Sequence, residues 1–217
     1  MHSINRIKLK VCGMRNPGNI REVAALHPDY MGFIFYPGSK RVVGEDFQIP
    51  TDFPPRTKRV GVFVNETTEN MMMLAIKHSL DFIQLHGEEP VAQCDELQKS
   101  GIKVIKAFSI DHDFNFDQLL PYKKVVDYFL FDTKGAAYGG TGKTFDWLLL
   151  KKYDQEIPFF LSGGLSLETI DKINELKGMN MHALDVNSGV EIEPGMKDVR
   201  LIEEIQMRRL NSHWLER

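Results

Sequence analysis

The chain alternates regularly: eight short runs rich in valine, isoleucine, leucine and phenylalanine are each followed by a longer stretch of helical or loop character. The runs begin near Lys8, Tyr30, Arg59, Phe82, Lys103, Tyr128, Pro158 and Ala183. Strands separated by helix-length segments pair in parallel through right-handed crossovers. Eight such units in 217 residues match a closed, eight-stranded (β/α)8 TIM barrel, whose lower size limit is about 200 residues. We therefore predict an α/β fold with a single domain over residues 1–217, in which residues 1–7 form a short N-terminal extension.

Local signals predict several of the intervening helices. Asn16-Pro17 offers a cap and a first-turn proline, whereas the connectors 43–55 and 111–122 contain prolines that predict irregular structure. Ser166 is a candidate cap for an apolar face of Leu167, Ile170, Ile173 and Leu176, Thr144 for a segment through Leu150, and Leu201, Ile202 and Ile205 mark a closing helix. An open, doubly wound sheet is the alternative fold, but the sequence has neither an early G-x-G-x-x-G turn nor a P-loop.

Composition excludes several classes of partner. The net charge of −3 gives no basic excess, so we expect no nucleic-acid partner. No run approaches the roughly 18 apolar residues of a membrane span, and the first ten residues do not resemble a signal peptide. Cys12 and Cys94 are too few for a disulfide framework and too far apart for a metal knuckle. We therefore expect a cytoplasmic, reducing setting with no membrane partner.

The ends of the predicted strands carry polar side chains. A TIM barrel has its active site at the C-terminal ends of its strands, and the alternation of side chains turns Lys10 and Cys12 inward on the first strand and Asp132 inward on the sixth. The same alternation sends Gln84 and His86 inward on the fourth strand, and Asp185 and Asn187 inward on the eighth. A thiol and a carboxylate so placed make an acid–base pair, and Lys10 is a candidate to stabilise the thiolate of Cys12.

Simpler roles for these residues stay open at this point. Cys12 can be a small buried filler, which is the commonest place for a single cysteine. Asp132 can cap the loop that follows it. Lys10 can pair with Asp185, because the first and eighth strands are neighbours in a closed barrel.

Glycine-bearing turns follow the seventh and eighth strands. They are Ser162-Gly163-Gly164 and Asn187-Ser188-Gly189. TIM barrels often hold a phosphate with the backbone N–H groups of these two loops, where glycine permits a close approach. The two turns therefore predict a phosphorylated small-molecule substrate. A further glycine-rich stretch at 138–144 lacks the spacing of a Walker loop, and we interpret it as a mobile loop over the sixth strand.

Four other features have less specific meanings. Arg41, in the loop after the second strand, is a candidate to hold a substrate carboxylate in a bidentate fork, although a solvated charge is the alternative. His86 is the one histidine at a strand end, so we predict no metal site. Cys94 has the spacing of a core residue. Met71-Met72-Met73 indicates helix packing, with an oligomer contact as the alternative.

Taken together, several motifs resemble the phosphoribosylanthranilate isomerase family. They run in order along nearly the whole chain: Lys10-Val11-Cys12-Gly13-Met14, Gly61-Val62-Phe63-Val64-Asn65, Gln84-Leu85-His86-Gly87-Glu88, Phe131-Asp132-Thr133-Lys134, Gly139-Gly140-Thr141-Gly142-Lys143-Thr144-Phe145-Asp146-Trp147, Leu161-Ser162-Gly163-Gly164-Leu165 and Asp185-Val186-Asn187-Ser188-Gly189-Val190-Glu191. The set is specific as a whole, whereas each motif alone is not.

The resemblance implies an isomerase of L-tryptophan biosynthesis that performs an Amadori rearrangement of N-(5-phosphoribosyl)anthranilate. Carried over by position, Asp132 is the general acid that opens the furanose ring and Cys12 is the general base that removes the C2 proton. Arg41 holds the anthranilate carboxylate, and His86 is a further substrate-binding residue. The phosphate is bound by Gly163, Gly164, Ser188 and Gly189. The iminium intermediate is its own electron sink, so the resemblance implies no cofactor.

The sequence departs from the family motifs at few positions, and few alternative functions fit it. Asn187 stands where the family often has serine. A pentose-phosphate epimerase would need a metal cluster, and an indole-glycerol-phosphate synthase would need a lysine acid and glutamates at strand ends, whereas Glu88 and Glu191 lie in loops. A barrel that binds a phosphorylated metabolite without turnover is the rival from another class. The related isomerase of histidine synthesis usually has paired aspartates, where this chain has Cys12. The chain is expected to be a monomer or a homodimer.

Overall fold

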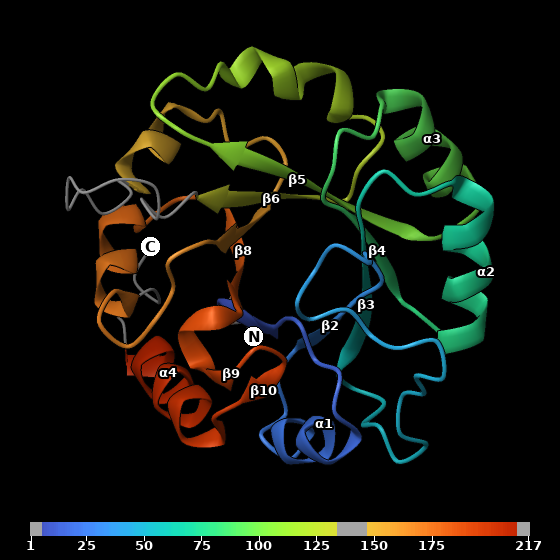
Figure 1. Cartoon of the computed structure of the whole chain (residues 1–217). Coiled ribbons are helices and arrows are strands. Elements are labelled where there is room, and N and C mark those ends of the chain that lie inside the picture. The colour runs from blue at the N-terminus through green and yellow to red at the C-terminus, as the bar shows by residue number, and fades with distance from the viewer. Residues whose placement is uncertain (1–5, 134–146, 212–217) are drawn as a thin grey trace, which may run out of the picture.

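Eight parallel strands close into a barrel in sequence order, with the helices around its outside (Figure 1). This computed structural model describes residues 6–133 and 147–211. The strands are β1 (Lys8–Val11), β2 (Tyr30–Ile34), β3 (Lys58–Phe63), β4 (Phe82–Leu85), β5 (Lys103–Ile110), β6 (Tyr128–Thr133), β7 (Phe159–Ser162) and β8 (Met181–Val186). The barrel closes between β1 and β8, where Lys10 lies opposite Asp185. The predicted fold class is confirmed, and every strand begins within two residues of its expected start.

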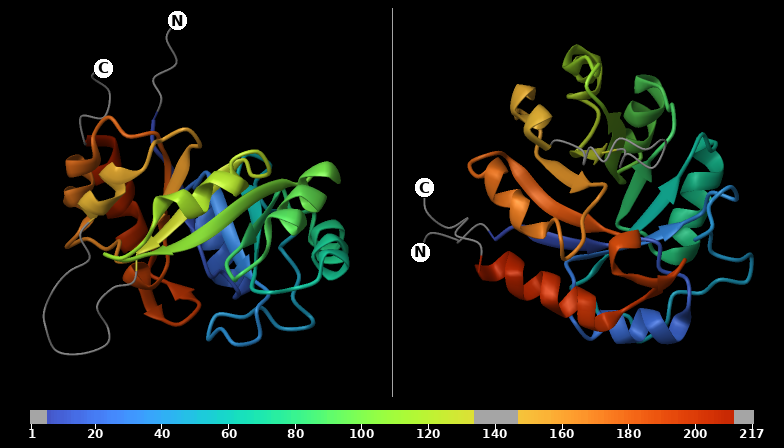
Figure 2. Two further views of the ribbon diagram at one scale, coloured as in Figure 1. Left: turned by 90° about the horizontal axis from the view of Figure 1, so that it is seen from above. Right: turned by 60° about the vertical axis from the view of Figure 1, so that its left-hand side comes forward.

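Helices of two kinds connect the strands (Figure 2). The α-helices are α1 (Pro17–Ala24), α2 (Thr68–His78), α3 (Val91–Lys99) and α4 (Val199–Asn211), and the 3-10 helices are η1 (Phe116–Tyr122), η2 (Trp147–Lys152), η3 (Ile170–Leu176) and η4 (Ser188–Val190). A small antiparallel hairpin, β9 (Glu191–Glu193) and β10 (Met196–Lys197), follows η4. As predicted, Asn16 caps α1, since its side chain accepts from the backbone N–H groups of Gly18 and Asn19. No helix of the described residues is long and apolar enough to span a membrane.

The connector after β7 differs from its prediction. The predicted helix is present as the 3-10 helix η3, but Thr169 and not Ser166 is at its N-cap position. Its buried residues Ile170, Ile173 and Leu176 are three apart, which is the repeat of a 3-10 helix. The cap predicted at Thr144 lies outside the described residues.

The other connectors follow their predictions. The segment 43–55 contains no helix, and the connector that includes Pro121 forms only the short η1. In the closing helix α4, Ile202 and Ile205 are fully buried. Met71 of α2 is buried whereas Met73 is exposed, so the methionine run is part of a helix with one face in the core.

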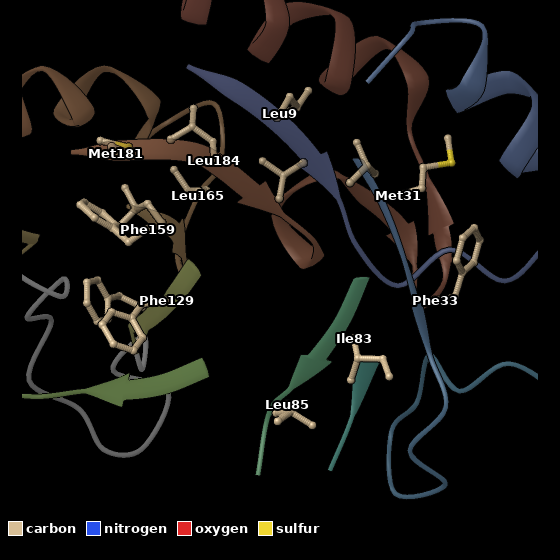
Figure 3. Close-up of a cluster of buried hydrophobic side chains, with 14 of the residues drawn as sticks. Leu9, Met31, Phe33, Ile83, Leu85, Phe129, Phe159, Leu165, Met181 and Leu184 are labelled. Atoms are coloured by element: carbon tan, nitrogen blue, oxygen red, sulfur yellow. The ribbon is translucent and has the colours of Figure 1, made fainter. Parts of the chain in front are cut away.

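Two apolar layers determine where a site can form. Outward-facing strand residues such as Leu9, Met31 and Phe33 pack beneath the helices (Figure 3). A second cluster fills the inside of the barrel and contains Tyr30, Val60, Phe82, Ile105, Ala107, Leu130, Phe160 and Ala183. Several of these residues, such as Tyr30 and Phe82, begin their strands and so lie at the N-terminal end of the barrel. The polar Lys10, Cys12 and Asp185 lie nearer the C-terminal ends of β1 and β8. The C-terminal end of the barrel is therefore its polar end.

Candidate active site

A cavity of about 450 Å³ lies at the C-terminal ends of the strands. Its lining includes all eight residues predicted from the sequence to form the site: Cys12, Arg41, His86, Asp132, Gly163, Gly164, Ser188 and Gly189. Apolar residues Ile34, Val62 and Val64 form part of the same wall. One cavity thus brings together residues at or just after the ends of seven different strands, as the active site of a TIM barrel does.

Cys12 follows β1 and is almost fully buried. Lys10, two residues earlier on the same face, is also buried, and its Nζ donates to Oδ1 of Asp185 at 2.9 Å. Burial raises the pKa of the Cys12 thiol, and the nearby positive charges of Lys10 and Lys197 oppose this without cancelling it. Lys10 therefore pairs with Asp185, and its positive charge also opposes the rise in the pKa of the Cys12 thiol.

A glycine on the neighbouring strand makes room for the thiol. Gly32 of β2 lies beside Cys12, and a Cβ built on Gly32 would be 2.6 Å from the Cys12 sulfur. Any larger residue at this position would push the thiol away. The place of the sulfur in the cavity therefore depends on Gly32.

Asp132 is the inward-facing carboxylate near the end of β6. Gln84 of β4 donates from its Nε2 to Nδ1 of His86 at 2.8 Å, which places the ring proton of His86 on Nε2. That nitrogen then donates to Oδ2 of Asp132 at 3.2 Å. The side chain of Asp132 is 36% exposed, so one carboxyl oxygen is fixed by His86 while the group still faces the cavity. The sequence placed all three residues inside the barrel but did not join them in a chain.

The two glycine turns lie against each other. Gly163 and Gly164 have φ values of +80° and +68°, in the left-handed region that favours glycine. Gly189 packs so closely on the loop after β7 that a Cβ there would overlap the carbonyl oxygen of Leu165. The turns after β7 and β8 therefore form one continuous backbone surface of the cavity. The glycine-rich stretch at 138–144 lies outside the described residues.

The side chain of Arg41 is paired with a carboxylate and is not a free charge in solvent. Its Nε donates to both carboxylate oxygens of Glu191, at 2.8 and 3.0 Å, and its Nη2 also donates to Glu191. Lys197 donates to Oε1 of Glu191 at 2.7 Å and to Oδ1 of Asn187 at 2.7 Å. Sequence reasoning gave no site role to Glu191 or Lys197. The available signal was Pro194-Gly195, a turn dipeptide that would pair residues 191 and 197 in a hairpin.

A closed parallel barrel with a polar cavity at its C-terminal end defines the chain as a TIM-barrel enzyme. A family model described as N-(5'phosphoribosyl)anthranilate (PRA) isomerase matches residues 9–207. The chain therefore belongs to the PRA isomerase family and is an isomerase.

Individual relatives agree with this membership. The chain is 50% identical over 194 residues to the N-(5'-phosphoribosyl)anthranilate isomerase of Parabacteroides distasonis, with 88% of each chain covered. A structure of phosphoribosyl anthranilate isomerase in complex with reduced 1-(o-carboxyphenylamino)-1-deoxyribulose 5-phosphate has a TM-score of 0.78 at 33% identity, covering 95% of this chain and 98% of that one. Monomers generated from the dimeric isomerase of Thermotoga maritima give a TM-score of 0.78 at 32% identity, covering 94% of this chain and 99% of that one.

Proposed function

We propose that this chain converts N-(5'-phosphoribosyl)anthranilate into 1-(2-carboxyphenylamino)-1-deoxyribulose 5-phosphate, a step of L-tryptophan biosynthesis. The observation that carries the proposal is the shared cavity, in which a thiol, a carboxylate, a guanidinium and two glycine turns lie together. The substrate has one feature for each of these groups: an enolisable C2, a ring oxygen, a carboxylate and a phosphate. The names of the relatives support the same reaction.

Asp132 is the general acid of the proposed mechanism. Its carboxyl group gives a proton to the furanose ring oxygen, the C1–O bond breaks, and the nitrogen lone pair forms the C1=N iminium. His86, which donates to one carboxyl oxygen, keeps the other oxygen directed at the substrate. Proton transfer by a positioned group of this kind is typically worth about 10²–10⁴-fold in rate.

Cys12 is the general base. Its thiolate takes the C2 proton of the iminium, and the electron pair moves through C1 to the nitrogen, so that an enol forms. The enol then tautomerises to the C2 ketone. The positive charge of Lys10 favours the thiolate that this step requires. Because the iminium accepts the electrons, the step needs neither a metal nor an organic cofactor.

The anthranilate carboxylate and the phosphate are at opposite ends of the substrate, and each has its own binding group in the cavity. Arg41 binds the anthranilate carboxylate, since a guanidinium matches a carboxylate with paired donors. The backbone around Gly163, Gly164, Ser188 and Gly189 holds the phosphate, because glycine lets the phosphate approach the N–H groups closely. We further propose that residues 1–217 form one domain and that the enzyme acts in the cytoplasm as a monomer or a homodimer.

The test is a fluorescence assay that follows the consumption of freshly generated phosphoribosylanthranilate with and without a chelator. We expect rapid loss that the chelator does not affect, and a fall of at least about 10²-fold in kcat for Cys12→Ala and for Asp132→Asn, each with an unchanged fold. Near-normal rates in either variant would refute that residue's role. A well-folded wild-type protein that binds the product analogue without turnover would favour a binding protein instead.

A further inference from the structure

Three charged side chains form a buried group at the edge of the cavity. Glu191 and Lys197 are opposite each other in the hairpin β9–β10, and Arg41 comes from the loop after β2. The side-chain exposures are 22% for Arg41, 5% for Glu191 and 0% for Lys197. We call this group the Glu191 brace. In Figure 1 the hairpin lies beside α1, to which the Asn19 side chain connects it by bonds to the backbone of Lys197.

The brace fixes one edge of the Arg41 guanidinium. Glu191 accepts the Nε–H and one Nη2–H, in the side-on geometry that holds a guanidinium in a single plane. Of its five N–H donors, two on Nη1 and one on Nη2 then remain for another acceptor, and no side chain of residues 6–133 or 147–211 takes them. Gly13 packs against the same side chain, since a Cβ there would be 2.8 Å from Cδ of Arg41. The remaining edge of Arg41 is therefore oriented rather than mobile.

The charges of the Glu191 brace leave a net positive charge that can attract an anionic ligand. Arg41 and Lys197 carry two positive charges and Glu191 one negative charge, so the group has a net charge of +1 beside the cavity. Although burial raises the pKa of Glu191, hydrogen bonds from Arg41 and Lys197 outweigh it and lower that pKa, so that Glu191 is ionised at neutral pH. A single carboxylate from the substrate would bring the net charge to zero.

We propose that Glu191 is a positioning residue, which orients Arg41 toward the substrate carboxylate, and that Lys197 keeps Glu191 in place. The inference rests on the proposed function, because the carboxylate is that of the anthranilate ring. Glu191 acts through Arg41 and does not touch the reacting atoms. Lys197 also donates to the side chain of Asn187, so the brace connects the carboxylate end of the site to the turn that precedes Ser188.

The first variant is Glu191→Gln, which keeps the shape of the side chain and removes its charge. We expect KM for phosphoribosylanthranilate to rise roughly tenfold while kcat changes less than about twofold, as expected for loss of a charge-assisted hydrogen bond that acts on binding. Glu191→Asp should recover part of the affinity, because the charge returns on a shorter arm.

A double-mutant cycle with Arg41→Ala distinguishes positioning from a general structural role. If Glu191 acts through Arg41, Glu191→Gln has no further effect on KM once Arg41 is absent. An equal rise in KM in both backgrounds would overturn the inference.

The paired variant Glu191→Gln/Lys197→Met controls for stability. Glu191→Gln alone leaves the ammonium of Lys197 buried without a charge partner and so lowers the unfolding temperature. The paired variant removes that ammonium, and we expect it to regain much of the lost stability while KM stays raised. Recovery of KM together with stability would show that the brace only holds the fold.

Binding of a fixed probe separates this inference from the reaction. The probe is reduced 1-(o-carboxyphenylamino)-1-deoxyribulose 5-phosphate, compared by calorimetry with the same molecule lacking the carboxyl group. We expect Glu191→Gln to weaken the first about tenfold and the second by less than twofold. Wild-type protein that binds the probe without turning over the substrate would refute the proposed function alone, whereas equal weakening of both probes would overturn the inference alone.

Discussion

At the scale of single residues, Cys12 is subject to two opposing demands. As the proposed general base it has to reach the substrate from a buried position, and burial makes the thiolate less stable. The charges that face it are Lys10 from its own strand, Asp185 from β8, Lys197 from β10 and Arg41 from the loop after β2. Lys10 gives the largest contribution that opposes burial, so we expect the loss of its charge to raise the pKa of the thiol further.

The pH dependence of kcat/KM should show this balance. As the proposed general base, Cys12 would work deprotonated, and its pKa is raised, so kcat/KM should increase with pH through the neutral and alkaline range up to that pKa. In Lys10→Met the opposing charge is lost, and the rising limb should move to higher pH. The measurement is a pH–rate profile together with the pH dependence of thiol alkylation in a Cys94→Ala background.

The control is Lys10→Met/Asp185→Asn, which also removes the carboxylate that Lys10→Met would leave buried alone. A rising limb at the same pH in wild type and both variants would show that Lys10 serves only the pairing with Asp185.

Gly32 gives a second prediction at this scale. In Gly32→Ala the added Cβ would be 2.6 Å from the Cys12 sulfur and 3.2 Å from its Cα, so the thiol has to move. We expect kcat to fall by roughly 10- to 100-fold, because small misplacements of a reacting group are costly. Gly44→Ala is the matched control, since nothing lies within 4 Å of a Cβ there. Equal activity of the two variants would contradict the prediction.

At the scale of elements, the loop after β4 is held by a third buried ion pair, besides Lys10–Asp185 and Lys197–Glu191. Glu89 accepts from the backbone N–H groups of Asn65 and Gly87 and pairs with Lys106 of β5 at 3.1 Å. Both side chains are at most 3% exposed. The loop carries His86, so this pair indirectly fixes the partner of Asp132.

Removing Glu89 should therefore destabilise the fold strongly. Glu89→Gln leaves the Lys106 ammonium buried without a charge partner, and we expect the free energy of unfolding to fall by about 3–5 kcal/mol. The measurement is urea unfolding followed by circular dichroism. Asp95→Asn breaks the exposed pair with Lys99 on α3 and should change stability by less than about 0.5 kcal/mol. Similar losses in both variants would contradict the assignment of Glu89 as a structural anchor.

The sequence could predict those elements whose signal lies within a short stretch of the chain. The apolar runs repeat at a regular interval, so the strands and the inward positions of Cys12 and Asp132 follow from periodicity alone. The helix η3 was predicted from its apolar residues, but its start was placed too early, at Ser166, because the sequence offers both Ser166 and Thr169 as N-cap residues. The Glu191 brace could not be found, since Arg41 and Glu191 are 150 positions apart and no local pattern joins them.

At the scale of the whole molecule, the N-terminal end of the barrel contains a histidine that titrates outside the neutral range. His182 lies among the rings of Tyr30, Tyr128 and Phe160, and its Nε2 is hydrogen-bonded to the hydroxyl of Tyr30 at 2.7 Å. Burial is the main cause that lowers the pKa of His182 to about 4. The neutral ring is therefore part of the folded structure.

The lowered pKa of His182 makes the stability of the fold decrease at acidic pH. Between pH 6.5 and 4 the unfolded chain binds a proton at His182 and the folded chain does not. The free energy of unfolding therefore has its full value above pH 6.5 and decreases as the pH falls toward 4. We expect a loss of about 1–2 kcal/mol, after allowing for partial solvent screening. Denaturant unfolding at several pH values measures it, and His182→Gln should have a shallower decline. Parallel declines in the two proteins would assign the acid sensitivity to other groups.

Barrel closure has a consequence for how the enzyme is made. The ammonium of Lys10, on the first strand of the barrel, meets the carboxylate of Asp185, 175 residues later in the chain, when β8 is inserted beside β1. Until β8 is present, burying the Lys10 ammonium without a charge partner would be costly, so we expect β1 not to pack into the barrel early during synthesis. A nascent chain that ends before β8 should therefore lack the charged surroundings of Cys12, which the eighth strand of the barrel completes.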